Sequence, residues 1–457
     1  IYPLIDKARK NIQEDKIFSG PFTGVPFLLK DLSISHPKEK TSYGSRWLKD
    51  YVPQVSSELR TRYEQSGFVI FGKTNTPEFG LDPVTEPSLW GACRNPWDLS
   101  KTPGGSSGGA AASVTARFCP VAHASDGAGS IRIPSACCGL FGLKPSRGRI
   151  PTGPDTGKQW AGLAGSHVIS RTVRDSAGVL LHSSGDDLGT PFPLEKIDSK
   201  LLEEIKTPEK NLKIALIEEP FFETKVDPEC LKSLSKTAKI CEDLGHEVIP
   251  SKLNINKSEL TRALLYLVAG EVATDIKQLA AVYPGTFNKT KLEYTTRFSR
   301  LLGSLFSACD YALTTRIFDK LTRITAQVFT EYDLILTPAL AKPPLYIGEL
   351  ALKPWQKALI PILEVIPLPK KLIEPIALEA LAEKLSFTPF TALFNITGEP
   401  AMSIPSGLSK TGLPLAVQFA APLKKELRLL RLASSLEKES AWQEVTEASK
   451  KLDLFKT

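Results

Sequence analysis

The chain has 457 residues, 42% of them hydrophobic, and is long enough to bury a sizeable core. Its formal net charge of +7 is small and its basic residues are scattered, which gives no reason to expect a nucleic-acid partner. No apolar run reaches the roughly 18 residues of a membrane-spanning helix, so we expect no transmembrane segment.

The seven cysteines have no Cys-x-x-Cys spacing, and the five histidines occur singly. This is not the pattern of a structural metal site, and we expect neither a metal nor a cofactor. An odd number of irregularly spaced cysteines in a long chain favours reduced thiols, which predicts a cytoplasmic protein. The chain starts at Ile1 rather than Met, which leaves open a trimmed N-terminus or a removed signal peptide.

Strand patterns alternate with helix patterns along the chain, which predicts an α/β fold. A short apolar run ends at Lys30, and the apolar segment 110–124 predicts a buried helix followed by a strand. Further helices are predicted at 1–17, 57–65, 173–182, 228–244, 264–281 and 301–329, and further strands at 68–71, 212–218, 247–250 and 334–338.

Residues 350–385 are apolar but are interrupted by five prolines. Repeated proline opposes one continuous helix, so we expect short turns and helix pieces there. An irregular packed excursion is the favoured interpretation, and a hydrophobic lid or partner surface is the alternative.

Two glycine-rich turns that carry serines flank the segment 110–124. The first spans 102–109 and the second 125–134, and clustered glycine marks backbone that lets another group approach closely. A flexible linker is disfavoured, because linkers do not alternate with tight apolar runs such as 140–143.

Two other segments match motifs of unrelated protein families. Residues 67–74 fit the pattern of a phosphate-binding loop, but bulky strand formers lie between its glycines and Pro77 follows it, so we reject ATP or GTP binding. Residues 105–109 fit the nucleophile elbow of α/β-hydrolases, with Ser107 as nucleophile. No apolar strand precedes this segment, so the elbow stays a secondary hypothesis.

The two glycine turns, together with 139–145, resemble the amidase signature family of serine amidases. Motifs at 24–31 and 72–79 precede them in the family's order, and 394–400 and 412–419 are similar to its closing elements. The resemblance is weakest between 201 and 331. It implies one large domain, 1–457, with a mixed central sheet sandwiched by helices. The catalytic core would span about 20–200 and 330–430, and a variable region at about 255–385 would shape the substrate pocket.

The resemblance also implies a Ser-Ser-Lys triad. Ser130 would be the nucleophile, Ser106 a proton relay joined to Gly105 by a cis peptide bond, and Lys30 the base. A lysine desolvated at the end of an apolar strand loses affinity for its proton, which suits that role.

Small residues before the nucleophile let backbone N–H groups converge, so Gly127, Ala128 and Gly129 are the predicted oxyanion hole. Each such donor is worth about 3 kcal/mol. The family often has glycine where this chain has Ala128. We expect Asp126 and Arg132 to brace the loop by pairing.

These features predict an enzyme that hydrolyses a small-molecule amide, linear or cyclic, and a homodimer is the candidate assembly. The connection containing 158–160 and 166–168 resembles general bacterial amidases and 6-aminohexanoate cyclic-dimer hydrolases. The alternatives are the amidase-like subunit of a tRNA-dependent amidotransferase, or a non-catalytic family member. Ile133 counts against the first, because that subfamily typically has glutamine there.

Overall fold

The computed structural model describes residues 1–14, 16–366 and 368–452. Eleven strands form one sheet in this part of the chain: β1 (Tyr2–Pro3), β2 (Pro26–Lys30), β3 (Val69–Thr74), β4 (Val121–Asp126), β5 (Phe141–Lys144), β6 (Gly165–Ser170), β7 (Lys213–Leu216), β8 (Glu247–Pro250), β9 (Leu334–Pro338), β10 (Ala401–Leu408) and β11 (Pro414–Ala420).

The α-helices are α1 (Ile5–Gln13), α2 (Glu58–Gln65), α3 (Gly108–Thr115), α4 (Arg132–Cys138), α5 (Val173–Ser183), α6 (Leu201–Glu204), α7 (Pro228–Asp243), α8 (Lys257–Val282), α9 (Tyr294–Leu305), α10 (Ala308–Val328), α11 (Pro354–Leu363), α12 (Lys370–Leu385), α13 (Leu393–Thr397), α14 (Glu426–Leu436) and α15 (Ser440–Lys450). Three short 3-10 turns are η1 (Glu78–Gly80), η2 (Gln159–Gly162) and η3 (Lys289–Lys291).

The sheet is mixed, with strand order β1-β3-β2-β4-β6-β5-β10-β11-β9-β7-β8. The β2 strand pairs in parallel with β3 and β4, and β7 pairs in parallel with β8 and β9, whereas the centre of the sheet is antiparallel. The predicted α/β class with a mixed central sheet is confirmed. Because β2 and β4 are neighbours, residues about 95 positions apart in the sequence meet where these two strands end.

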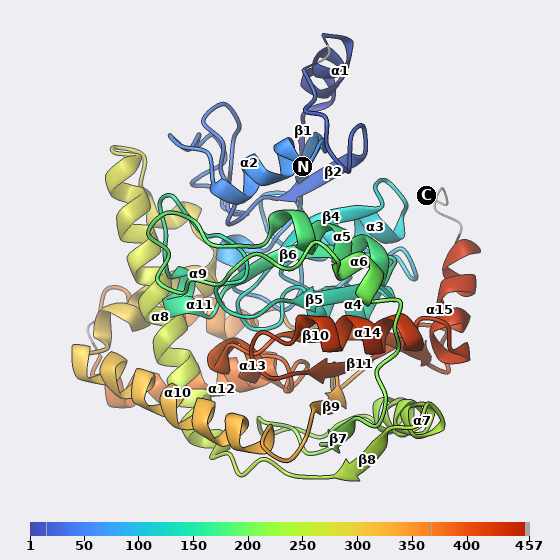
Figure 1. Cartoon of the computed structure of the whole chain (residues 1–457). Helices are drawn as coiled ribbons and strands as arrows, with labels where there is room; N and C mark the ends of the chain where they lie inside the picture. Colours follow the sequence, from blue (N-terminus) through green and yellow to red (C-terminus); the bar gives the residue numbers. More distant parts are fainter. Residues whose placement is uncertain (15, 367, 453–457) are drawn as a thin grey trace.

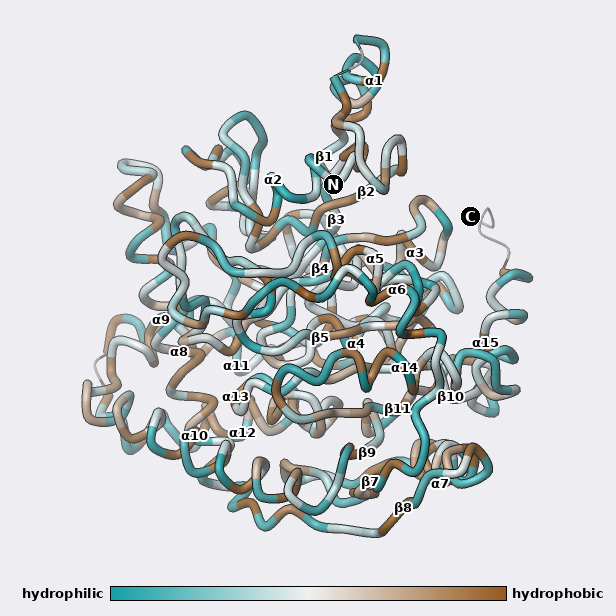
Figure 2. Tube along the Cα trace, in the orientation of Figure 1, coloured by the Kyte–Doolittle hydropathy of each residue, from teal (hydrophilic) through white to brown (hydrophobic). Residues whose placement is uncertain are grey.

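Helices cover the sheet and extend beyond it on one side (Figure 1). The helices α8, α9 and α10 pack together at the left of that view, and β7, β8 and α7 lie at the bottom. Figure 2 shows hydrophilic stretches on outer helices such as α15. The strands β4 and β5, near the centre of the sheet, are buried along their whole length, which makes this part of the sheet a rigid support for a site.

The prediction of one helix over 301–329 is wrong, because the chain forms α9 and α10 with a break at Phe306 and Ser307. The Ser307 side chain accepts the N–H of Asp310, and Asp310 accepts from Ser307 in return. This capping box satisfies backbone donors at a new helix start and so favours two helices over one.

The expectation of an irregular segment at 350–385 is also wrong in part, because α11 and α12 are regular helices that contain Pro361 and Pro375. A proline inside a helix costs about 3 kcal/mol. Burial of Leu363, Ile373 and Ala377 against α8 and α9 offsets that cost. Tertiary packing therefore overrides the local proline signal.

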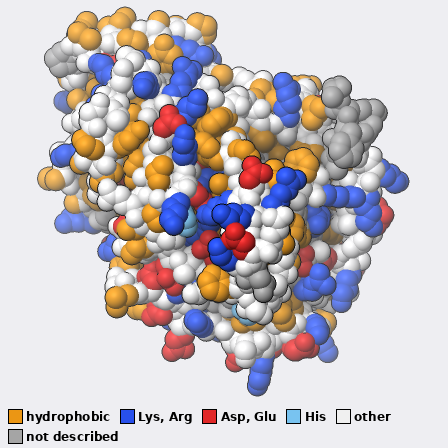
Figure 3. All heavy atoms as spheres, turned by 90° about the horizontal axis from the view of Figure 1, so that it is seen from above, with side chains coloured by type: hydrophobic (Ala, Val, Ile, Leu, Met, Phe, Trp, Pro, Cys, Tyr) orange, Lys and Arg blue, Asp and Glu red, His pale blue; other side chains and the backbone are white. Residues whose placement is uncertain are grey.

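Among the described residues, none of the helices combines the length and apolarity needed to cross a bilayer. Seen from above, acidic and basic side chains are intermixed over the centre of the molecule, and hydrophobic side chains gather near the upper left (Figure 3).

Candidate active site

Lys30 is the last residue of β2, and its whole side chain is buried. Its Nζ lies 2.7 Å from Oγ of Ser106 and 3.0 Å from Oγ of Ser125. Ser125 lies on the neighbouring strand β4, and Ser106 lies in the first glycine turn. The structure thus brings together Lys30 and Ser106, two of the three predicted triad residues, and adds Ser125.

Burial lowers the pKa of Lys30 from 10.5 to about 7, although Asp126 acts in the opposite direction. A buried ammonium loses its hydration, so the neutral amine is favoured. Near neutral pH a large fraction of Lys30 is therefore an uncharged amine that can accept a proton from a hydroxyl.

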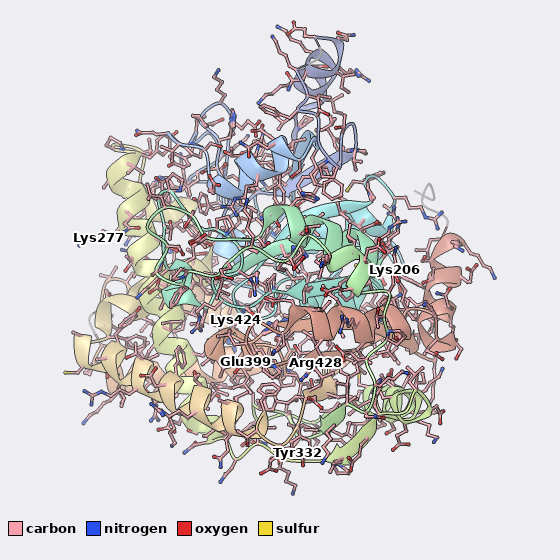
Figure 4. All side chains as sticks on the ribbon, viewed as in Figure 1. Lys206, Lys277, Tyr332, Glu399, Lys424 and Arg428 are labelled. Carbon is pink, nitrogen blue, oxygen red and sulfur yellow. The ribbon has the colours of Figure 1, made fainter. Side chains whose placement is uncertain are left out.

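A lowered pKa alone does not single out Lys30. Burial also lowers the pKa of Lys144 to about 7 and that of Lys73 to about 8. Lys144 donates to the backbone oxygen of Pro145 at 2.9 Å, and the buried Glu399, which Figure 4 shows beside α13, acts to raise its pKa. Only the contact with a serine of the glycine turns distinguishes Lys30 from these two lysines.

The apparent phosphate-binding loop at 67–74 is a strand in the structure. Residues Val69–Thr74 form β3, and Lys73 is buried against the hydroxyl of Thr41 and near Asp31. Strand backbone cannot wrap a phosphate as a glycine loop does, which is consistent with the rejection of nucleotide binding there.

The first glycine turn leads into α3, and the Gly105–Ser106 peptide bond is cis, which confirms what the resemblance implies. Ser106 and Ser107 are both buried, but they face different partners. Ser107 Oγ donates to the backbone oxygen of Ser125 at 3.2 Å, and no histidine hydrogen bonds to it among the described residues. The elbow hypothesis therefore lacks its base.

Ser130 lies in the turn between β4 and α4 and is half-buried. Its Oγ makes no hydrogen bond within the described residues, so the hydroxyl is available to a ligand. Of the three predicted oxyanion donors, Gly129 already donates its N–H to Oδ1 of Asp126 at 2.6 Å. The N–H groups of Gly127 and Ala128 have no acceptor among the described residues.

The indole of Trp160 lies against this loop. A Cβ placed on Gly127 would be 3.0 Å from Cε3 of Trp160. Trp160 and Ala161 both have positive φ, at 49° and 50°, a conformation that is costly for residues other than glycine. Trp160 is half-buried, so its ring forms a partly accessible wall beside the proposed oxyanion loop.

The pairing of Asp126 with Arg132 is confirmed, with two contacts of 3.0 Å between buried side chains. Although burial acts to raise it, the Arg132 guanidinium holds the pKa of Asp126 at about 2. Arg132 also donates to Asn395 Oδ1 at 2.5 Å and to Gln418 Oε1 at 2.7 Å. The two closing motifs, 394–400 and 412–419, therefore converge on the brace of the loop that carries Ser130.

Sequence reasoning missed several residues of this site. Ser125 and His123 lie on one face of β4, at alternate positions, and that spacing is the signal that could have found them. Asn395 and Gln418 lie inside motifs that were recognised, but nothing local shows that their side chains point toward Arg132. Trp160 lies inside the connection whose resemblance was recognised, but nothing local shows that its ring reaches the loop, because that contact is made only in the tertiary fold.

Within residues 1–14, 16–366 and 368–452, no group of three or more His, Cys, Asp or Glu side chains is arranged to hold a metal ion.

Comparison with known proteins defines the class of protein. The family model described as Amidase matches residues 4–430. The 6-aminohexanoate-cyclic-dimer hydrolase of Paenarthrobacter ureafaciens is 33% identical over 97% of this chain and 87% of its own length. The solved structure of 6-aminohexanoate cyclic dimer hydrolase with substrate has a TM-score of 0.86 at 31% identity, and covers 100% of this chain and 91% of the other. A bacterial aryl acylamidase of the amidase signature family has a TM-score of 0.83 at 25% identity, over 99% of this chain and 91% of its own.

The chain therefore belongs to the amidase (amidase signature) family. It is a hydrolase that cleaves carboxylic amides.

Proposed function

We propose that this chain hydrolyses amides through an acyl-enzyme on Ser130, with Ser106 as proton relay and Lys30 as base. Neutral Lys30 takes the proton of the Ser106 hydroxyl while Ser106 takes the proton of Ser130. The Ser130 oxygen then forms a bond to the amide carbon, and the carbonyl oxygen becomes an oxyanion. The N–H groups of Gly127 and Ala128 would hold that charge, each being worth about 3 kcal/mol.

The same relay then carries the proton in the opposite direction. Lys30 returns its proton through Ser106 to the departing nitrogen, the C–N bond breaks, and the amine leaves an ester on Ser130. Water then gives a proton to the relay and attacks the ester, which releases the carboxylic acid and restores Ser130. A hydroxyl both donates and accepts, so Ser106 can serve both directions.

The observation that carries this proposal is the 2.7 Å contact between Lys30 Nζ and Ser106 Oγ, in a site where burial lowers the pKa of the lysine to about 7. Lys30→Met keeps the length of the side chain but removes the base. We expect it to abolish acylation while thermal unfolding remains cooperative. The matched control is Lys144→Met, which removes a buried lysine of similar pKa and should retain turnover. The Nζ of Lys144 donates to the backbone oxygen of Pro145 and to no serine among the described residues. Full turnover by Lys30→Met would eliminate the mechanism.

A serine-reactive phosphonate probe identifies the nucleophile directly. We expect peptide mapping to find the label on Ser130, and Ser130→Ala to prevent labelling. Ser107→Ala is the control for the elbow hypothesis. Label on Ser107 would transfer the nucleophile to that residue and would sink the proposed triad.

We infer that the substrate is a small-molecule amide, linear or cyclic. Support comes from the activities for which two relatives are named, a cyclic-dimer hydrolase and an aryl acylamidase. A panel of aryl amides, fatty amides, small aliphatic amides and cyclic lactams, ranked by kcat/KM, tests this class. No detectable turnover of any linear or cyclic member of the panel would contradict it.

A cytoplasmic location and a homodimer stay predictions. The first is supported by the free state of all seven cysteines, which suits a reducing compartment. Fractionation of cells tests the location. The molar mass in solution, measured by light scattering, tests the homodimer.

A further inference from the structure

Lys30 is held by β4 through its backbone as well as through its side chain. On one side β2 pairs with β3 as far as Lys30 and Thr74. On the other side the pairing with β4 is limited to Leu28 and Ala122, so no strand carbonyl is paired with the N–H of Lys30. That N–H donates instead to Nδ1 of His123, at 3.2 Å. A buried backbone N–H needs an acceptor, and here a side chain supplies it.

By accepting this hydrogen bond at Nδ1, the His123 ring leaves its own N–H without a partner in the part of the chain that the structure describes. The side chain is fully buried, and because Nδ1 is the acceptor, the ring proton of the neutral imidazole must sit on Nε2. Nε2 has no hydrogen-bond partner among the described residues, and the ring packs against Tyr63 with centroids 5.9 Å apart. An unpaired buried donor costs about 1–3 kcal/mol, and an apolar side chain at this position would transfer that cost from Nε2 to the N–H of Lys30.

The same strand also contacts the far end of the lysine. Ser125 lies two residues after His123, on the same face of β4, and its Oγ is 3.0 Å from Lys30 Nζ. Lys30 is therefore fixed at both ends by alternate residues of one strand. Its Nζ is thereby held against Ser106 rather than left to the freedom of a four-carbon chain.

We infer that His123 is a positioning residue of the hydrolytic site: its Nδ1 fixes the backbone of Lys30 so that the amine reaches Ser106. The inference rests on the proposed role of Lys30 as the base. His123 touches neither the serine hydroxyls nor the substrate in this account. It acts through the geometry of the lysine.

Three substitutions separate positioning from simple packing. In His123→Asn the amide oxygen can occupy the position of Nδ1 and keep the acceptor. His123→Gln places its polar atoms farther out, near the former Nε2. His123→Leu fills similar volume with no acceptor. The measurements are kcat and KM on an anilide, the rate of phosphonate labelling at Ser130, and thermal unfolding of each variant.

We expect Leu and Gln to lower kcat and the labelling rate by about 100-fold, with KM within about twofold of wild type, because a displaced catalytic group costs rate rather than binding. Asn should restore kcat to within about threefold of wild type. If the Leu variant does not fold, the comparison of Asn with Gln carries the test.

Equal kcat for Asn and Gln, whether high or low, would overturn the inference, as would a change confined to KM. The test presupposes that Lys30→Met is inactive. Normal turnover by Leu or Gln beside an inactive Lys30→Met would overturn the positioning role alone. Full turnover by Lys30→Met would contradict the proposed base and, with it, the reason for holding Lys30.

Discussion

The carboxylate of Asp126 accepts the backbone N–H of Gly129 at 2.6 Å. The same carboxylate accepts the N–H of Ile131 at 3.2 Å and is paired with Arg132. The loop that carries Ser130 is therefore closed around an internal anion rather than left to the flexibility of its glycines. This bonding turns Gly129 away from a substrate and leaves Gly127 and Ala128 as the open donors.

Replacing Arg132 with lysine tests this brace. A lysine supplies one point charge where the guanidinium makes separate bonds to Asp126, Asn395 and Gln418, so buried acceptors are left unpaired. We expect a loss of about 3 kcal/mol or more in the free energy of unfolding. Activity per folded molecule should also fall by at least about tenfold, as the loop loosens.

The control for that loss is Arg149→Lys, which weakens a buried pair with Glu426, 3.0 Å apart. Among the described residues, this pair makes no hydrogen bond to the loop that carries Ser130. It should lower the stability measured by urea unfolding but leave kcat per folded molecule unchanged. Equal losses of kcat in both variants would show that the brace has no special link to catalysis.

The activity should depend on pH through Lys30. The base works only when uncharged, and burial lowers its pKa to about 7. We expect kcat/KM to fall about tenfold per pH unit below 7 and to level off above it. A profile measured from pH 5.5 to 9 with a neutral amide checks this. A flat profile, or one that rises only above pH 10, would contradict a lysine base of lowered pKa.

A methyl group at position 127 should disturb the site through Trp160. The Cβ of Gly127→Ala would lie 3.0 and 3.2 Å from two carbons of the indole, so the ring must move. We expect kcat/KM to fall about tenfold, by analogy with other small displacements near reacting groups. In the Trp160→Ala background the same change should have little effect. Additive losses in the double variant would show that the two residues do not act together.

Stability on the acid side should depend on His167. Burial lowers the pKa of this ring from 6.5 to about 3, and its Nε2 lies 2.9 Å from Oγ of Ser176. The unfolded chain binds the proton below pH 6.5 and the folded chain does not. The stabilisation is therefore present above pH 6.5 and is lost as the pH falls, by roughly 2 kcal/mol between pH 7 and pH 5.

His167→Gln can keep the contact with Ser176 and does not titrate. We expect its unfolding free energy to change less between pH 7 and pH 5 than that of wild type, as measured in urea. The exposed His182, replaced in the same way, is the control and should leave the pH dependence nearly as it was. An identical pH dependence in wild type and His167→Gln would contradict the expectation.

Local pattern alone identified much of the framework. The helix at Pro228–Asp243 begins with the cap Asp227 and a first-turn proline, and both signals lie within a few residues. The break between α9 and α10 was missed, because the apolar period continues through Ser307 while the capping box ends it. The regular helix around Pro375 was missed for the opposite reason, since its support comes from α8, about a hundred residues earlier.

The sequence by itself determined the family and the order of the motifs, and it predicted Lys30, Ser106 and Ser130 as the triad, because glycine turns and strand ends are written in short stretches of chain. Only the tertiary structure decided which groups surround them. Ser125 and His123 reach Lys30 because the strands β2 and β4 are packed side by side. Asn395 reaches Asp126 because a helix distant in sequence is packed against the end of β4. The burial that lowers the pKa of Lys30 likewise belongs to the whole assembled sheet, since no short segment can remove water from an amine.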